Sequence, residues 1–184
     1  MFGLTFPKPY ADRVARLRVP AGFLLAAAFV WFSSPTARSL WLGIPLSMFG
    51  LALRAWAAGH LEKNQQLAVS GPYACTRNPL YLGTLLVEAG LAIAARSWGL
   101  AILFAAVLVL IYFPVVQLEE QHLRKLFPEY AEYAQRVPAF GMRLQGSKTP
   151  GPHFRFSLYL RNQEYQALGG FLAGVLLLVW KMQR

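Results

Sequence analysis

Charged residues are scarce in this sequence. Only 14% of its 184 residues are Asp, Glu, Lys or Arg, whereas 56% are hydrophobic. A soluble domain of this size would have about a quarter of its residues charged. The shortage argues against an ordinary soluble protein and predicts a single membrane domain over residues 1–184.

Cysteine and metal-ligand clusters are also scarce. Cys75 is the only cysteine, so an intramolecular disulfide is excluded. No His or acid at a supporting spacing favours Cys75 as a nucleophile. His60 has no companion ligand, and Glu119 with His122 forms a single two-ligand pair, so we expect no metal site.

The net charge of +10 requires a different explanation from binding to an acidic partner. The Lys and Arg residues are scattered between apolar runs and form no stripe, so no nucleic-acid partner is expected. Basic residues on a hydrophobic chain more often flank membrane spans, where they hold loops on the cytoplasmic side.

Five apolar runs cover about residues 19–32, 40–58, 79–95, 98–117 and 167–180. A membrane-spanning helix needs about 20 residues, with roughly 17 as the lower limit. The first and last runs are short and would need flanking residues. Arginines precede the first run, as in a signal peptide, but no cleavage pattern follows it, so we favour an uncleaved span. The pattern predicts an all-α polytopic membrane protein with about five transmembrane helices, including an extra C-terminal one over residues 166–182.

The loop charges predict an orientation. Basic residues precede the first run, lie between the second and third, and are most numerous between the fourth and fifth. The alternate loops hold only Arg38 and Arg96. The positive-inside rule therefore places the N-terminus in the cytoplasm and the C-terminus outside, in a multi-pass protein of the cell (inner) membrane.

Little more than Arg96 and Ser97 joins the third and fourth runs. So short a link predicts an antiparallel helical hairpin over residues 79–117, whose cytoplasmic ends, 77–83 and 118–120, are neighbours. The fourth run is expected to continue into the cytosol as an amphipathic helix that Pro128 bends or ends.

The two hairpin ends carry candidate functional groups. Arg77 and Asn78 before Pro79 could simply start a helix, with Asn78 as its N-cap, or could form an anion pocket. Glu119 and Glu120 could be a solvated pair at a helix exit or could bind a cationic group beside Arg77 and Asn78.

Glu88 lies inside an apolar run, where a carboxylate is costly and needs a partner or a cavity. We expect either an ion pair with Arg54 or a position at the acceptor end of a cavity. Gly170 and Gly174 form a small-xxx-small pair that suits close helix packing, within the chain or in a homodimer.

Several short motifs follow one another in a familiar order. They are Gly71-Pro72-Tyr73, then Arg77-Asn78-Pro79-Leu80-Tyr81-Leu82-Gly83, then Glu119-Glu120, then Phe127-Pro128-Glu129-Tyr130 with Tyr133 and Val137-Pro138. This order and spacing resembles the isoprenylcysteine carboxyl methyltransferase family, which is related to the phospholipid methyltransferases. The resemblance covers about residues 60–140, a methyltransferase core, and leaves the N-terminal spans and the last helix outside it.

The resemblance implies a membrane methyltransferase that uses S-adenosyl-L-methionine, binds it in a cytosol-facing pocket, and takes a lipophilic acceptor or lipid from the surrounding membrane lipids. It assigns catalytic roles to Glu119 and Arg77. The cofactor-binding residues that it implies are His60, Gln65, Gln66, Leu67, Ala68, Tyr73, Asn78, Pro79, Leu80, Tyr81, Glu119 and Glu120.

Two positions depart from the family pattern. Asn78 replaces a histidine, and Val115 stands where prenylcysteine enzymes carry an arginine associated with the acceptor carboxylate. The second departure argues against a prenylcysteine carboxylate and favours a neutral, amine or phospholipid acceptor. Two other functions stay open: a membrane NADPH-dependent reductase of the sterol reductase type, and a non-catalytic membrane protein that retains the fold.

Overall fold

The computed structural model describes residues 6–141 and 153–184, and within these ranges it contains helices but no strand. The all-α prediction is therefore confirmed. The helices are α1 (Lys8–Phe32), α2 (Ala37–Ala58), the 3-10 turn η1 (Gly71–Ala74), α3 (Pro79–Ala95), α4 (Trp98–Val107), the π-helical turn η2 (Leu108–Tyr112), α5 (Phe113–Leu126), α6 (Tyr130–Arg136), α7 (Phe156–Arg161) and α8 (Tyr165–Met182).

Three helices of the described chain are long and apolar enough to cross a membrane: α2, the continuous helix from α4 to α5, and α8. Helix α1 adds a fourth if its two parts, which meet at 53° just before Pro20, form one span. Helix α3 is apolar but has 17 residues, at the lower limit for a span. The fourth run continues beyond its apolar part to Leu126 and ends before Pro128, as predicted.

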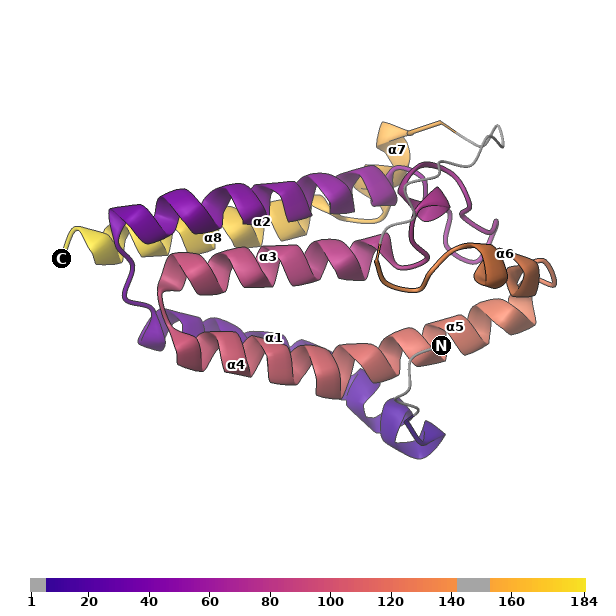
Figure 1. Cartoon of the computed structure of the whole chain (residues 1–184), viewed down its shortest axis with the longest axis horizontal. Coiled ribbons are helices and arrows are strands. Elements are labelled where there is room, and N and C mark those ends of the chain that lie inside the picture. Colours follow the sequence, from indigo (N-terminus) through magenta and orange to yellow (C-terminus); the bar gives the residue numbers. More distant parts are fainter. Residues whose placement is uncertain (1–5, 142–152) are drawn as a thin grey trace.

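The helices form two groups (Figure 1). Helices α2, α3 and α8 run together, and α1 packs along the continuous helix from α4 to α5. The two groups meet where the α3–α4 link lies and separate toward the other end. We call this other end, which carries the end of α2, the start of α3 and the end of α5, the polar end.

The closest helix contact is between α2 and α3. A Cβ atom built on Gly50 would lie 2.6 Å from the carbonyl oxygen of Gly83 and 2.8 Å from the backbone nitrogen of Val87. The Ser47 hydroxyl donates to the carbonyl of Val87 at 3.0 Å, and Ser39 donates to that of Ala94 at 2.8 Å. In lipid, no hydrophobic driving force holds helices together. The two helices therefore associate through the close packing of small residues and through hydrogen bonds from serine hydroxyls.

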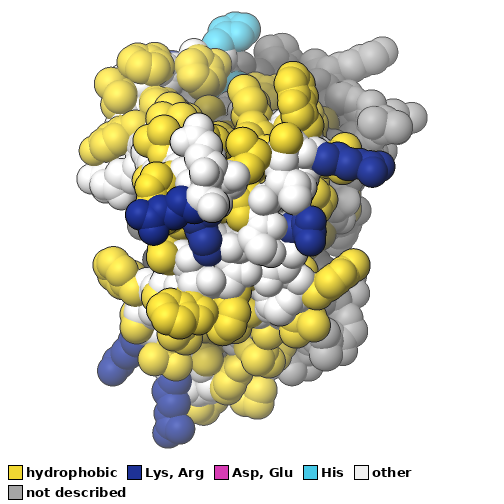
Figure 2. Space-filling view, turned by 90° about the vertical axis from the view of Figure 1, so that its left-hand side faces the viewer, with side chains coloured by type: hydrophobic (Ala, Val, Ile, Leu, Met, Phe, Trp, Pro, Cys, Tyr) yellow, Lys and Arg dark blue, Asp and Glu magenta, His cyan; other side chains and the backbone are white. Residues whose placement is uncertain are grey.

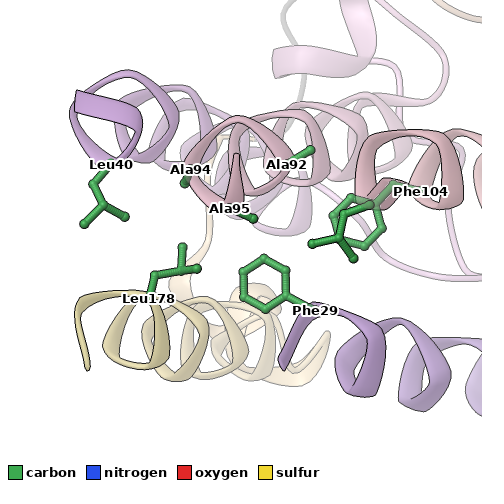
Figure 3. Close-up of a cluster of buried hydrophobic side chains, with 8 residues drawn as sticks. Phe29, Leu40, Ala92, Ala94, Ala95, Phe104 and Leu178 are labelled. Atoms are coloured by element: carbon green, nitrogen blue, oxygen red, sulfur yellow. The ribbon is translucent and has the colours of Figure 1, made fainter. Parts of the chain in front are cut away.

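A buried hydrophobic cluster joins the two groups at the end opposite the polar end (Figure 3). The rings of Phe29 and Phe104 stack with centroids 6.5 Å apart, and Leu178 of α8 is fully buried beside them. Ala94 and Ala95 bring the end of α3 into the same cluster. Because α1, α3, α4 and α8 all contribute side chains, this cluster holds the two groups of helices together at this end.

The same end carries exposed tryptophans and basic side chains. Trp31, Trp41 and Trp98 are each at least 80% exposed, and they belong to three different helices. Lys and Arg side chains, and no acidic ones, are visible among hydrophobic side chains on this face (Figure 2). Tryptophan and flanking cations are typical of a membrane–water interface.

The long fourth helix widens at η2, just before Pro114. Proline has no backbone N–H, so the carbonyl of residue 110 loses its helical partner. The Tyr10 hydroxyl donates to this Leu110 carbonyl at 2.8 Å and so ties α1 to η2. The wider turn also sets the position of Tyr112, whose ring packs edge-on against Tyr81 with centroids 6.1 Å apart.

The α2–α3 contact gives a first prediction. Gly50→Ala places a methyl group against two backbone atoms of α3, and we expect it to lower the unfolding free energy by about 1–3 kcal/mol, as overpacking does. Thermal unfolding in detergent, followed by circular dichroism, measures the change. Gly169→Ala is the matched control, since its added Cβ meets nothing within 4 Å. Equal melting temperatures for the two variants would contradict the close contact.

Candidate active site

The hairpin brings two neighbouring glutamates to the start of α3. The Tyr81 hydroxyl donates to Glu119 Oε2 at 2.9 Å. Glu120 Oε1 pairs with Arg77 Nη2 at 3.1 Å and accepts from Asn78 Nδ2 at 3.4 Å. The predicted juxtaposition of the two hairpin ends is confirmed, but each glutamate meets its own partners, because successive residues of a helix point in different directions.

Arg77 and Asn78 tie α6 and the residues just after it to the start of α3. Arg77 Nη1 donates to the carbonyl of Ala134 at 2.9 Å, and Asn78 Nδ2 donates to that of Ala139 at 3.1 Å. Asn78 occupies the N-cap position of α3, yet its side chain makes no capping bond. The predicted N-cap position of Asn78 is therefore confirmed, but its side chain does not cap the helix, because the amide is engaged by Ala139 and Glu120.

A hollow lined by both polar and apolar residues lies inside the bundle, and we call it the central cavity. Its volume is about 760 Å³, and α1, α2, α3, α5 and the start of α8 all contribute to its wall. It extends from Lys63 and Glu119 at the polar end to Val87 and Glu88 within α3. Its lining residues are Val19, Gly22, Leu51, Arg54, Lys63, Leu80, Tyr81, Thr84, Val87, Glu88, Tyr112, Val115, Glu119, Glu164 and Ala167.

Arg54 is held by Glu164 in this cavity. Its Nε and Nη2 donate to the two carboxylate oxygens of Glu164 at 3.0 and 2.7 Å, a bidentate pair. Its Nη1 donates to the Leu80 carbonyl at 3.3 Å and to the Thr84 hydroxyl. The expected Arg54–Glu88 pair is wrong, because Glu164, at the N-cap of α8, offers both oxygens to the guanidinium.

A second hollow, the outer cavity, is lined by α5 and by the segment that includes α6 and the residues just after it. Its volume is about 770 Å³, and Arg77, Glu120, Arg124 and Arg136 line it. The central and outer cavities thus receive one glutamate each: Glu119 lines the first and Glu120 the second.

The polar stretch after α2 is placed differently from the hairpin ends. His60 is buried, and its Nδ1 donates to the Trp56 carbonyl at 2.9 Å, since a carbonyl only accepts. Gln65 and Gln66 are exposed, and Ala68 is half-buried. These residues line neither cavity in the structure, so their predicted cofactor contacts stay predictions.

Leu67 and Tyr73 belong to packed structure at the polar end. Leu67 joins a buried cluster with Tyr130 and Tyr133 of α6. Tyr133 donates from its hydroxyl to the Tyr73 carbonyl at 2.7 Å. Burial, with a smaller contribution from Glu119, raises the pKa of the Tyr73 hydroxyl, so this group stays protonated and can donate a hydrogen bond.

Of the predicted site residues, Leu80, Tyr81 and Glu119 line the central cavity, while Arg77 and Glu120 line the outer one. Asn78 and Pro79 are buried at the start of α3. Sequence reasoning missed Thr84, Tyr112 and Glu164 in the central cavity. The one feature of the sequence that pointed to a residue such as Glu164 was Arg54, because an arginine within an apolar run needs a hydrogen-bond acceptor.

The fold and the site together define a class of protein. It is a polytopic helical bundle with a cavity that leads from its polar end into its interior. Residues 21–130 match the phospholipid methyltransferase family, and the chain belongs to this family. The match begins in α1, so the N-terminal spans, which sequence analysis left outside the resemblance, are part of it. Family membership supports a membrane methyltransferase.

Three curated relatives are similar to this chain. The cobalt-zinc-cadmium resistance protein CzcN of Cupriavidus metallidurans is 36% identical over 141 residues, 72% of this chain and 64% of the relative. The nickel-cobalt-cadmium resistance protein NccN of Alcaligenes xylosoxydans xylosoxydans is 34% identical over 62% of this chain and 53% of the relative.

The third relative is the protein-S-isoprenylcysteine O-methyltransferase B of Arabidopsis thaliana, 34% identical over 42% of this chain and 40% of the relative. It confirms the resemblance to that family. The matched part spans less than two thirds of the length of each of the three relatives. No solved structure matches the chain.

The Arg77–Glu120 pair gives a second prediction. Glu120→Gln leaves a guanidinium that is only 10% exposed without its charged partner, and we expect a loss of about 1.5–3 kcal/mol of unfolding free energy. Glu132→Gln is the control, because the Arg136–Glu132 pair is 63% and 72% exposed and should cost less than about 0.5 kcal/mol. Denaturant unfolding in detergent compares them, and equal losses would contradict the buried pair.

Proposed function

We propose that this protein is an integral membrane methyltransferase that uses S-adenosyl-L-methionine to methylate a lipophilic small molecule or lipid. The observation that carries the proposal is the continuity of the central cavity. Its lining includes Lys63 and Glu119 at the polar end and Thr84, Val87 and Glu88 within an apolar helix. A water-soluble cofactor and a membrane-dissolved acceptor could meet in one such space.

The polar end of the cavity suits the cofactor in its charges. S-adenosylmethionine supplies a methyl group on a positively charged sulfur and carries an amino acid end with both charges. Lys63 is a cation for the carboxylate of that end, and Glu119, oriented by Tyr81, is an acceptor for its ammonium group. The outer cavity suits it less, because Glu120 is already paired there with Arg77.

The inner part of the cavity suits an acceptor without a carboxylate. Val115 lies buried on its wall, at the position where prenylcysteine enzymes carry an arginine, and Arg54 is occupied by Glu164. Methyl transfer mainly requires the acceptor atom to lie in line behind the methyl group, which a shaped cavity achieves by positioning. The names of the metal-resistance relatives state a phenotype and no chemical reaction, so the proposal rests on the family and the cavity.

The third prediction tests cofactor binding. Purified protein in lipid nanodiscs is expected to bind S-adenosylmethionine saturably in isothermal titration calorimetry. Glu119→Gln removes the charged acceptor, and we expect it to weaken binding about 10- to 100-fold, equivalent to the loss of one charge-assisted hydrogen bond. Tyr81→Phe should weaken binding less, because it removes only the group that orients Glu119.

Glu129→Gln is the matched control, since Glu129 is exposed at the start of α6 and lines neither cavity. The proposal fails if the wild-type protein does not bind S-adenosylmethionine, or if Glu119→Gln binds it as tightly as Glu129→Gln. Saturable binding of NADPH in place of S-adenosylmethionine would support the reductase. Cofactor binding without methyl transfer to any lipid extract would support a non-catalytic protein.

A further inference from the structure

Glu88 lines two hollows. One is the central cavity; the other is a hollow of about 480 Å³ between α3 and α4, which we call the apolar groove. Both include Glu88 in their lining. The groove is otherwise lined mostly by apolar side chains of α3 and α4, among them Ala92, Phe104 and Ala105, and it runs from Glu88 about 12 Å along α3 toward Arg96.

No hydrogen bond or ion pair holds the Glu88 carboxylate within residues 6–141 and 153–184. The cation nearest to it along the cavity wall, Arg54, is engaged by Glu164 and by Leu80 and Thr84. A carboxylate inside a membrane protein is costly unless it faces a partner or a cavity that serves function. Glu88 lines a cavity, and Arg54 acts on it through its charge alone, with no hydrogen bond or ion pair between them among the described side chains.

The charges around the cavity determine which ligand would suit Glu88. The lining includes three carboxylates, on Glu88, Glu119 and Glu164, against two cations, on Arg54 and Lys63. Because Arg54 and Glu164 neutralise one another, a negatively charged head group near Glu88 would meet repulsion and no free guanidinium among the described side chains of the central cavity. A head group that donates a hydrogen, neutral or cationic, would instead gain a charge-assisted hydrogen bond.

Resting on the proposed function, we propose that Glu88 binds the reactive head group of the methyl acceptor and takes up its proton, while the hydrocarbon tail of the acceptor lies in the apolar groove. The acceptor is then a long-chain amine, alcohol or thiol, not a carboxylate. Glu88 is the lining residue that the two hollows share, and this assigns the tail to the groove, because one molecule occupying both must pass this side chain.

The step balances with the groups named. The lone pair of the acceptor nitrogen, oxygen or sulfur forms a bond to the methyl carbon. The carbon–sulfur bond of the cofactor breaks, and its electron pair stays on sulfur, which becomes a neutral thioether. The proton of the acceptor moves to the Glu88 carboxylate, which becomes a carboxylic acid and later releases the proton to water. Such general base assistance contributes about 10²- to 10⁴-fold in rate.

The fourth prediction separates this role from the proposed function. Four probes with the same tail are dodecylamine, dodecanol, dodecanethiol and dodecanoic acid, each tested for transfer of a tritiated methyl group from S-adenosylmethionine. We expect at least one of the first three to be methylated and dodecanoic acid not. Glu88→Gln should bind S-adenosylmethionine as the wild type does, yet lower kcat about 10²- to 10⁴-fold. Glu88→Asp should restore at least tenfold of that loss, and Glu129→Gln should retain wild-type kcat.

The groove has its own readout, independent of turnover. A dodecylamine with a photoreactive diazirine at the end of its tail should crosslink to peptides of α3 and α4 that line the groove. Excess dodecylamine should suppress the labelling, and excess dodecanoic acid should not. Ala105→Phe, which places a ring in the groove from an exposed position, should reduce the labelling and raise KM for the methylated probe without lowering kcat.

The outcomes are distinguishable. If the wild type does not bind S-adenosylmethionine, the proposed function fails. If it binds the cofactor but methylates only dodecanoic acid, or none of the probes, the acceptor class is wrong. If Glu88→Gln transfers methyl groups at the wild-type rate, or if labelling falls outside the groove, the role of Glu88 or of the groove is wrong while the methyltransferase function stands.

Discussion

The close approach of α2 and α3 determines where Arg54 and its partners lie. The side chain of Arg54 passes over Gly83, where an added Cβ would lie 2.5 Å from Arg54 Cγ. With no side chain there, the guanidinium reaches Thr84 on α3 and Glu164 at the start of α8. One cation inside the bundle therefore joins three helices, and this group of helices stands apart from α1, α4 and α5 at the polar end, leaving the central cavity between them.

Two adjacent glutamates have different surroundings because successive residues of α5 point in different directions. Glu120 neutralises Arg77 and helps to hold α6 against the start of α3. Glu119 is oriented by Tyr81 and lines the central cavity. Glu119 is the carboxylate that we propose for cofactor binding, and the Tyr81 hydroxyl that donates to it fixes its direction without neutralising its charge.

Much of this was predictable from sequence, and the reasons are physical. The short Arg96–Ser97 link required an antiparallel hairpin, and Arg96 adopts a left-handed conformation (φ 53°) with Ser97 as N-cap to make it. The meeting of residues 77–81 with Glu119 and Glu120 followed. The partner of Arg54 was not predictable, because Glu164 lies far along the chain and sequence spacing does not fix how α8 packs. Nor did periodicity reveal that α3 packs more closely on α2 than on α4, its hairpin neighbour.

The central claim is that the cavity shared by Tyr81, Glu119 and Glu88 holds the methyl donor beside its acceptor. A crystal structure of the protein in lipid with S-adenosylhomocysteine, the product form of the donor, tests it most directly. We expect density for the amino acid end beside Glu119 and Tyr81, with the sulfur directed toward Glu88. Density in the outer cavity, between Arg77 and Glu120, would contradict it.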